Sequence, residues 1–371
     1  DAGKLGEPND VVCAGIEHKL GINGNPTCTM KFGEKGKGAV GYLVGEANRG
    51  LEYMFIMMNA ARFSVGVQGY AVADRAYQSS LAYAKERVQM TDVASRSKES
   101  VRIIEHPDVR RMLMWQKANI EAMRALSYVT AASLDFAHKS PDEKTRKEHK
   151  AFVELMIPVV KGWCTENAID LCSNALQIFG GMGYVEETGI AQQYRDVRIT
   201  TIYEGTTGIQ ALDLVGRKLV RDMGATATAV MKRMEADAKA AAASENADVK
   251  AIGEALLKGI ATLAEVSQWL GMNAMGDLRK AFACSVPYLK LWGVVAGGWQ
   301  MARAAMVAAA KIAGGDKDPF YAAKITTSKF YASHVLSQGA WYKRQVIDGS
   351  GDVMTLPEEA YELDRKMAVT A

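Results

Sequence analysis

The chain carries the stretch QIFGGMGY at 177–184, followed by YRDVRITTIYEGTTGIQ at 194–210. The first segment predicts a helix that ends at Phe179, because Gly180 and Gly181 can take left-handed conformations that stop a helix. A GGxG motif after a helix is not a dinucleotide fingerprint, since GxGxxG must follow a strand. The glycines therefore indicate a helix end and a loop that a ligand can approach.

A second helix is predicted to begin at Thr206 or Thr207, because threonine is a good N-cap residue. Gly183 keeps the loop before it slim, so that a ligand can reach the backbone. Apolar residues at helical spacing predict the buried face of this second helix: Ile209, Leu212, Val215 and Leu219.

Glu204 stands directly before this helix, after Ile202 and Tyr203 and before Gly205. An acidic residue here could simply complement the helix dipole. The apolar and aromatic run, the glycine and the helix N-terminus favour another interpretation, in which a desolvated carboxylate lies beside backbone N–H donors. Such a carboxylate is suited to proton abstraction.

The rest of the chain predicts a mainly α fold after an initial β segment. Three short strands are expected at 10–16, 27–32 and 39–44, separated by turn-forming residues. From Gly50 onward apolar residues recur at helical spacing in long segments, which is typical of an antiparallel bundle. The segment 140–150 is dense in charge and predicts a solvated connection.

The C-terminal part predicts further helices. Residues 223–248 form a candidate linking helix with a soft domain boundary, and Gly314-Gly315-Asp316 with Pro319 predicts a loop before a helix that begins near Phe320. One buried stripe is expected from Leu256, Ile260, Leu263 and Val266. Core or interface packing is expected for Trp269, Trp292, Trp299 and Trp341.

The composition of the chain argues against several classes of protein, among them nucleic-acid binders and membrane-spanning proteins. Lys and Arg number 45 against 42 Asp and Glu, a net charge of +3, and 49% of residues are hydrophobic. This balance argues against a nucleic-acid binder, and no run approaches the roughly 20 apolar residues of a membrane span. The cysteines form no CxxC pair and the histidines are scattered, so the sequence predicts no metal site. Five scattered cysteines indicate reduced thiols and a cytoplasmic location: Cys13, Cys28, Cys164, Cys172 and Cys284.

Several spaced motifs resemble the acyl-CoA dehydrogenase family, flavoenzymes that oxidise the Cα–Cβ bond of acyl-CoA thioesters in fatty-acid β-oxidation. The pattern is Q-x-x-G-G-x-G-Y, then Y-R-D-x-R, then I-Y-E-G-T-x-x-I-Q. Upstream, KLGINGNPTC at 19–28 is similar to a late β-domain segment of the family, and GEANRGL at 45–51 to the entry of its helical bundle.

The resemblance implies a domain organisation. Residues 1–47 would be the C-terminal part of a middle β-domain, 48–224 a four-helix-bundle dehydrogenase domain and 225–371 an added C-terminal helical domain. The chain opens on Asp1 within strand-like sequence, so we expect that it lacks the N-terminal part of the family fold. The added domain and the run HPDVRRML at 106–113 are similar to a longer branch, especially to enzymes that act on 3-methylthiopropanoyl-CoA.

The resemblance also implies the chemistry. Glu204 would remove the substrate α-proton, while its backbone N–H polarises the thioester carbonyl, and the β-hydrogen would leave as hydride to FAD. Tyr203, Gly205 and Arg62 would contact the acyl-CoA substrate. Arg62 could instead be a surface salt-bridge partner.

The cofactor residues implied by the resemblance fall into two groups. Arg87 would reach the flavin diphosphate of a neighbouring subunit, with Gln89 where relatives commonly carry threonine, and Thr206 would bond the flavin at the helix start. The adenylate portion would contact Gln177, Gly180 and Gly181. For Gln177 and Thr206 simple capping is the alternative.

The resemblance implies a homodimer or homotetramer, with electron-transfer flavoprotein as electron acceptor. Two other hypotheses remain open. An acyl-CoA oxidase would pass electrons to oxygen on the same fold. A non-catalytic helical scaffold would keep the bundle without the chemistry, and the aromatic-rich C-terminal region favours that hypothesis.

Overall fold

A computed structural model of the chain describes residues 3–94, 96 and 98–362. The chain divides into two compact units, the first ending at Ala61 and the second starting at Arg62. In the part described, no helix combines the length and apolar character needed to cross a bilayer.

The first unit contains an antiparallel hairpin of β1 (Val11–Ile16) and β2 (Cys28–Phe32), with Val11 opposite Phe32. The predicted third strand at 39–44 is wrong. The side-chain amide of Asn9 bonds both the N–H and the carbonyl of Val40, so this backbone is not free to join a ladder.

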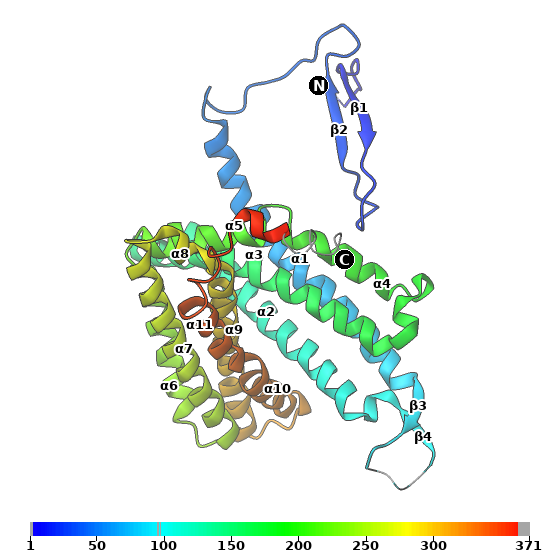
Figure 1. Cartoon of the computed structure of the whole chain (residues 1–371), viewed down its shortest axis with the longest axis vertical. Coiled ribbons are helices and arrows are strands. Elements are labelled where there is room, and N and C mark those ends of the chain that lie inside the picture. The colour runs from blue at the N-terminus through cyan, green and yellow to red at the C-terminus, as the bar shows by residue number, and fades with distance from the viewer. Residues whose placement is uncertain (1–2, 95, 97, 363–371) are drawn as a thin grey trace. The chain divides into compact units, whose positions relative to one another are not determined.

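The second unit is a set of packed helices and one short hairpin (Figure 1). The long helices α2 and α3 run side by side, and α9 packs against both of them and against helices of the C-terminal region. The elements are α1 (Gly50–Glu86, whose first turns belong to the first unit), β3 (Val88–Thr91), β4 (Ser100–Arg102), α2 (Pro107–Lys139), α3 (Glu143–Phe179), α4 (Ile190–Arg198), α5 (Thr207–Asp213), α6 (Ala225–Ala242), α7 (Ala247–Ala274), α8 (Leu278–Ala283), α9 (Ser285–Ala313), α10 (Pro319–Phe330) and α11 (Gly339–Ile347).

The charged segment 140–150 is not a connection, because α3 already begins at Glu143. The carboxylate of Asp142 caps the helix by accepting from the Thr145 N–H at 2.7 Å. Lys147 pairs with Glu143 one turn earlier at 2.6 Å. Charges at this spacing support an exposed helical turn as readily as a loop.

The second predicted helix begins as expected, with Thr206 as N-cap and Thr207 as the first residue. The predicted buried face is only half right. Val215 and Leu219 are buried, whereas Ile209 and Leu212 are 44% and 43% exposed. A π-helix over Leu214–Val220 follows α5 and changes the residue spacing, so one 3.6-residue stripe does not describe both segments.

The C-terminal predictions hold where helical spacing is regular. The stripe Leu256, Ile260, Leu263 and Val266 is buried on α7, and α10 begins at Pro319 after the predicted loop. The segment 223–248 contains α6, which packs on α7 as part of the core. Trp292 and Trp299 are fully buried, but Trp341 is 58% exposed.

The core depends on close approach between α3 and α9 at a glycine. Trp163 of α3 is 1% exposed, and a Cβ added to Gly293 of α9 would lie 2.0 Å from the indole Cγ. Neither backbone can move away without opening the packed core. Gly293 is therefore the contact surface for one of the three fully buried tryptophan rings, Trp163, Trp292 and Trp299.

We predict that Gly293→Ala lowers the free energy of unfolding by about 1–3 kcal/mol, because the added methyl group overpacks this contact. Urea denaturation followed by circular dichroism measures the change. The matched control is Gly271→Ala in α7, where an added Cβ meets nothing within 4 Å. That variant should gain up to about 1 kcal/mol from helix propensity. Equal stability of the two variants would contradict the packing account.

Candidate active site

Glu204 lies on a short loop between the 3-10 turn Ile199–Thr201 and α5, with its side chain half-buried. Its backbone φ is 55° and that of Gly205 is 88°, so two successive residues are left-handed. For a non-glycine residue this conformation costs about 1–2 kcal/mol and persists only where neighbouring groups hold it. At Gly205 an added Cβ would lie 2.8 Å from Nε2 of Gln210. Glycine is therefore required at this position.

Two buried side chains hold the loop from inside the bundle. Nζ of Lys161, on α3, donates to the carbonyl oxygen of Gly205 at 2.6 Å. Nε2 of Gln210, on α5, lies 3.3 Å from the carbonyl oxygens of both Glu204 and Gly205 and donates to them. Lys161 and Gln210 are both 0% exposed. The carbonyl groups of the loop are thus satisfied by the protein interior.

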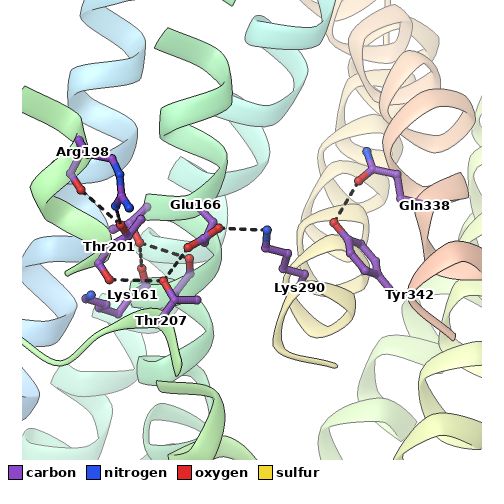
Figure 2. Close-up of polar contacts among 10 residues, drawn as sticks. Lys161, Glu166, Arg198, Thr201, Thr207, Lys290, Gln338 and Tyr342 are labelled. Carbon is purple, nitrogen blue, oxygen red and sulfur yellow. Dashed lines mark hydrogen bonds and ion pairs between the residues drawn. The ribbon is translucent and has the colours of Figure 1, made fainter. Parts of the chain in front are cut away.

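The start of α5 is tied to α3 by a second polar chain. Figure 2 shows Glu166 of α3 between Thr207 and Lys290. Its Oε1 accepts from the Thr207 hydroxyl at 2.7 Å, and its Oε2 pairs with Nζ of Lys290 at 3.0 Å. Desolvation by burial lowers the pKa of Lys161 to about 8, although the Glu166 carboxylate opposes this shift. The loop therefore rests on a buried cation and on a fixed helix start.

Arg62 lies beneath the loop, as a buried ion-pair partner and not an exposed one. Its side chain is 7% exposed, and NH1 lies 3.4 Å from Oδ2 of Asp213. Arg217 pairs with the other oxygen of Asp213 at 2.7 Å. This pair links α1 to the end of α5, so the helix that carries Arg62 also supports the Glu204 loop.

Tyr203 and Thr206, which flank Glu204 and Gly205, are each held by a hydrogen bond. The Tyr203 hydroxyl donates to Oε1 of Gln68 on α1, and burial raises the pKa of the Tyr203 phenol. The Thr206 hydroxyl accepts from the Ile209 N–H at 3.3 Å, which is the capping role that the sequence left as an alternative. Tyr203 is therefore a neutral, fixed aromatic wall beside the carboxylate.

The remaining predicted residues lie together at the far end of α1. An open pocket of about 540 Å³ has in its lining the five residues Arg87, Gln89, Gln177, Gly180 and Gly181. Stacking of Tyr83 on Phe179, with ring centroids 4.3 Å apart, joins the ends of α1 and α3. The φ of Gly180 is 59° and stops α3 as predicted, whereas Gly181 does not adopt a positive φ.

The charge and openness of this pocket suit an anion. Arg87 is exposed, and its guanidinium makes no ion pair or hydrogen bond to any residue that the structure describes. A Cβ added to Gly180 or Gly181 would meet nothing within 4 Å, so their backbone faces open space. His106 bonds the Gln89 carbonyl at 2.8 Å and fixes the β3 backbone there.

The structure thus brings the predicted residues together in two groups and not in one. Arg62 lies beside the Glu204 loop, while Arg87 follows the last residue of α1. At ~1.5 Å rise per residue, the helix separates these groups by about 36 Å. Across the described residues, no three or more His, Cys, Asp or Glu side chains are grouped to hold a metal ion.

Sequence reasoning missed the residues that support the loop. Gln68 lies in no motif that distinguishes it, and Gln210 closes the I-Y-E-G-T-x-x-I-Q pattern but was assigned no role. A signal existed for Lys161, which is the one charged residue within the apolar run FVELMIPVVKGWC after Glu154. Lysine is almost never fully buried in a protein unless its ammonium group is paired, so a lysine in an apolar run indicates a buried polar partner. The burial of Arg62 had no comparable signal.

Comparison with known families matches two models in succession. The model described as "Acyl-CoA dehydrogenase, C-terminal domain" matches residues 48–220. The model described as "Acetyl-CoA dehydrogenase C-terminal like" matches residues 219–357. Together they span most of the chain.

Curated relatives extend the similarity along the chain. A 3-methylmercaptopropionyl-CoA dehydrogenase of Ruegeria pomeroyi is 43% identical over 96% of this chain and 59% of its own length. The broad-specificity linear acyl-CoA dehydrogenase FadE5 of Mycobacterium tuberculosis is 34% identical over 97% of this chain and 61% of its own length. The chain spans about 60% of the length of these relatives.

Solved structures show the same fold. ACDH-11 of Caenorhabditis elegans, in complex with C11-CoA, has a TM-score of 0.71 and 18% identity, covering 91% of this chain and 54% of its own. An acyl-CoA dehydrogenase of Bacillus anthracis complexed with FAD has a TM-score of 0.70 and 19% identity, covering 92% and 57%. With consecutive family models and a 43% identical relative, the chain belongs to the acyl-CoA dehydrogenase family.

Proposed function

We propose that this chain carries the catalytic base and part of the flavin site of an FAD-dependent acyl-CoA dehydrogenase. The observation that carries the proposal is Glu204 on a strained loop whose carbonyls are held by Lys161 and Gln210. Strain of this kind is characteristic of functional sites, because it fixes a side chain in one orientation. The reaction would convert an acyl-CoA thioester to the trans-2-enoyl-CoA.

Glu204 would take the substrate α-proton on a carboxylate oxygen. An α-hydrogen beside a thioester is weakly acidic, so the carbonyl must be polarised as the proton leaves, and the Glu204 backbone N–H would donate to the carbonyl oxygen. Tyr203 would wall the acyl group on one side, and Gly205 would leave room for the thioester. When bound, FAD supplies the acceptor for the β-hydrogen, which leaves as hydride.

The residues present fit FAD in two places. Arg87 offers an unpaired guanidinium for a diphosphate, and Gln89, Gln177 and the exposed backbone of Gly180 and Gly181 offer polar contacts beside it. Thr206 caps the helix start beside the Glu204 loop, where backbone N–H groups favour an anion or a polar ring edge.

Separation of these places supports an assembly of identical subunits. We infer that the Arg87 pocket would hold the FAD of a neighbouring copy, while Thr206 would contact the flavin used by Glu204 of the same copy. A homodimer or homotetramer meets this requirement. We also propose electron-transfer flavoprotein as electron acceptor, and a reducing, cytoplasmic compartment agrees with five unpaired cysteines.

For the substrate we propose 3-methylmercaptopropionyl-CoA, the same compound as 3-methylthiopropanoyl-CoA. The support is 43% identity to the Ruegeria pomeroyi enzyme over 96% of this chain, against 34% for the FadE5 relative.

We predict that Glu204→Gln in the native enzyme retains FAD and loses acyl-CoA oxidation by at least about 100-fold, the scale of general-base catalysis. Anaerobic mixing with 3-methylmercaptopropionyl-CoA, followed by flavin absorbance, measures the rate. The matched control is Glu187→Gln, which changes an exposed carboxylate of the 3-10 turn Glu186–Thr188, and this variant should oxidise substrate at the wild-type rate. Undiminished oxidation by Glu204→Gln would refute the assignment.

Arg87→Met should weaken FAD binding by roughly 10-fold or more, since a hydrogen bond to a charged group contributes about 1.5–3 kcal/mol. Fluorescence titration of the apoenzyme with FAD gives the affinity. Lys85→Met removes one exposed cation of the last turn of α1 without touching the pocket, and should leave affinity unchanged. An equal effect of both variants would show that only net charge matters.

A further inference from the structure

Lys161 is buried at a cost that fold stability does not explain. Its side chain is 0% exposed among apolar neighbours in α3, where a charged group is disfavoured unless it is paired. No carboxylate of the described residues lies within ion-pair distance of Nζ, and Glu166 is already engaged by Thr207 and Lys290. Nζ donates a hydrogen bond to the Gly205 carbonyl at 2.6 Å.

This bond fixes the residue that follows Glu204. Gly205 and Glu204 are the two consecutive left-handed residues, and a non-glycine residue such as Glu204 would otherwise relax to negative φ. Gln210 donates to the same two carbonyls from α5, at the longer distance of 3.3 Å. A charge-assisted bond is shorter and stronger than an amide bond to the same acceptor, so Lys161 is the main restraint.

We propose that Lys161 is a positioning residue for Glu204: its buried ammonium holds the Gly205 carbonyl and thereby keeps the Glu204 carboxylate oriented for proton abstraction. The inference rests on the proposed function of Glu204. It assigns to Lys161 no contact with substrate or flavin. An interaction this close to a reacting group is sensitive to small displacements, and a shift of about 1 Å can reduce a rate by about 100-fold.

The test isolates proton abstraction from flavin reduction. The probe is 3,3-dimethylbutanoyl-CoA, which has α-hydrogens but no β-hydrogen, incubated with the native enzyme in D₂O. Mass spectrometry follows deuterium uptake at the α-carbon. We expect Lys161→Met to lower the maximal exchange rate by about 100-fold while the KM for the probe changes by less than about 3-fold, because only transition-state alignment is lost.

Thermal unfolding separates positioning from structural support. Methionine matches the length and apolar stem of lysine, and Gln210 still serves the Gly205 carbonyl, so the melting temperature of Lys161→Met should equal or exceed that of the wild type. Lys324→Met is the matched control, because Lys324 is 16% exposed and its partner Glu121 keeps Lys117 at 2.7 Å. This control should exchange at the wild-type rate.

The pH profile gives a further readout. The charged groups that face Nζ are Glu166 of the same helix, Arg62 of α1 and Glu204 of the loop. Burial, assisted by the positive charge of Arg62, outweighs the two carboxylates and lowers the pKa of Lys161 to about 8. As pH rises above about 8 the ammonium becomes an amine and its bond to the carbonyl weakens. Wild-type exchange should therefore fall through this range, and the fall should be absent in Lys161→Met.

The outcomes are distinguishable. Wild-type exchange in Lys161→Met, with exchange lost in Glu204→Gln, would overturn the positioning role and leave the proposed function intact. Exchange retained in Glu204→Gln would refute the proposed function itself. A reduced rate with a markedly lower melting temperature would also overturn the positioning role. If Lys161→Met does not fold, Lys161→Gln, which keeps a neutral hydrogen-bond donor but no charge, is measured in its place, and an unchanged exchange rate would overturn the proposal.

Discussion

The hydrogen bond from the buried Lys161 ammonium to the Gly205 carbonyl is the constraint on which the site depends. It acts across the bundle, from the middle of α3 to the loop before α5. Around it, Glu166 fixes Thr207 and Asp213 fixes Arg62, so that α1, α3 and α5 converge on one loop. The Lys161 ammonium, at the centre of α3, can hold the loop in this way because its side chain is fully buried. Two residues further along α3, Trp163 packs closely against Gly293 of α9.

Local physical chemistry accounts for the parts of the fold that the sequence predicts. Glycines after Phe179, threonines before α5 and the regular stripe on α7 each depend on neighbours within a few residues. The predictions fail where the conformation of a segment depends on a group or a helix irregularity outside that segment. Asn9 occupies the backbone of Val40 and prevents a third strand, and the π-helix after α5 shifts the buried face away from Ile209 and Leu212. Neither effect has a periodic signature in the chain.

The candidate site divides in the same way. Motif resemblance pointed to Tyr203, Glu204 and Thr206, which lie together because they fall within four residues of sequence. It also pointed to Gln177 and Arg87, which meet because α1 and α3 end side by side. It did not point to Lys161 or Gln68, and it included Gln210 without a role, since the roles of these three residues are set by the groups that their side chains reach. The distance of about 36 Å along α1 from Arg62 to Glu86, which directly precedes Arg87, likewise follows only once a single helix is seen to join the two groups.

A crystal structure of the native enzyme with FAD and a non-oxidisable acyl-CoA tests the central claim, that Glu204 is the base. The account predicts a Glu204 carboxylate oxygen about 3–3.5 Å from the substrate α-carbon, the separation of a near-attack geometry. It also predicts the Lys161–Gly205 hydrogen bond unchanged from the 2.6 Å described above. A different carboxylate at the α-carbon, with Glu204 turned away from the thioester, would contradict it.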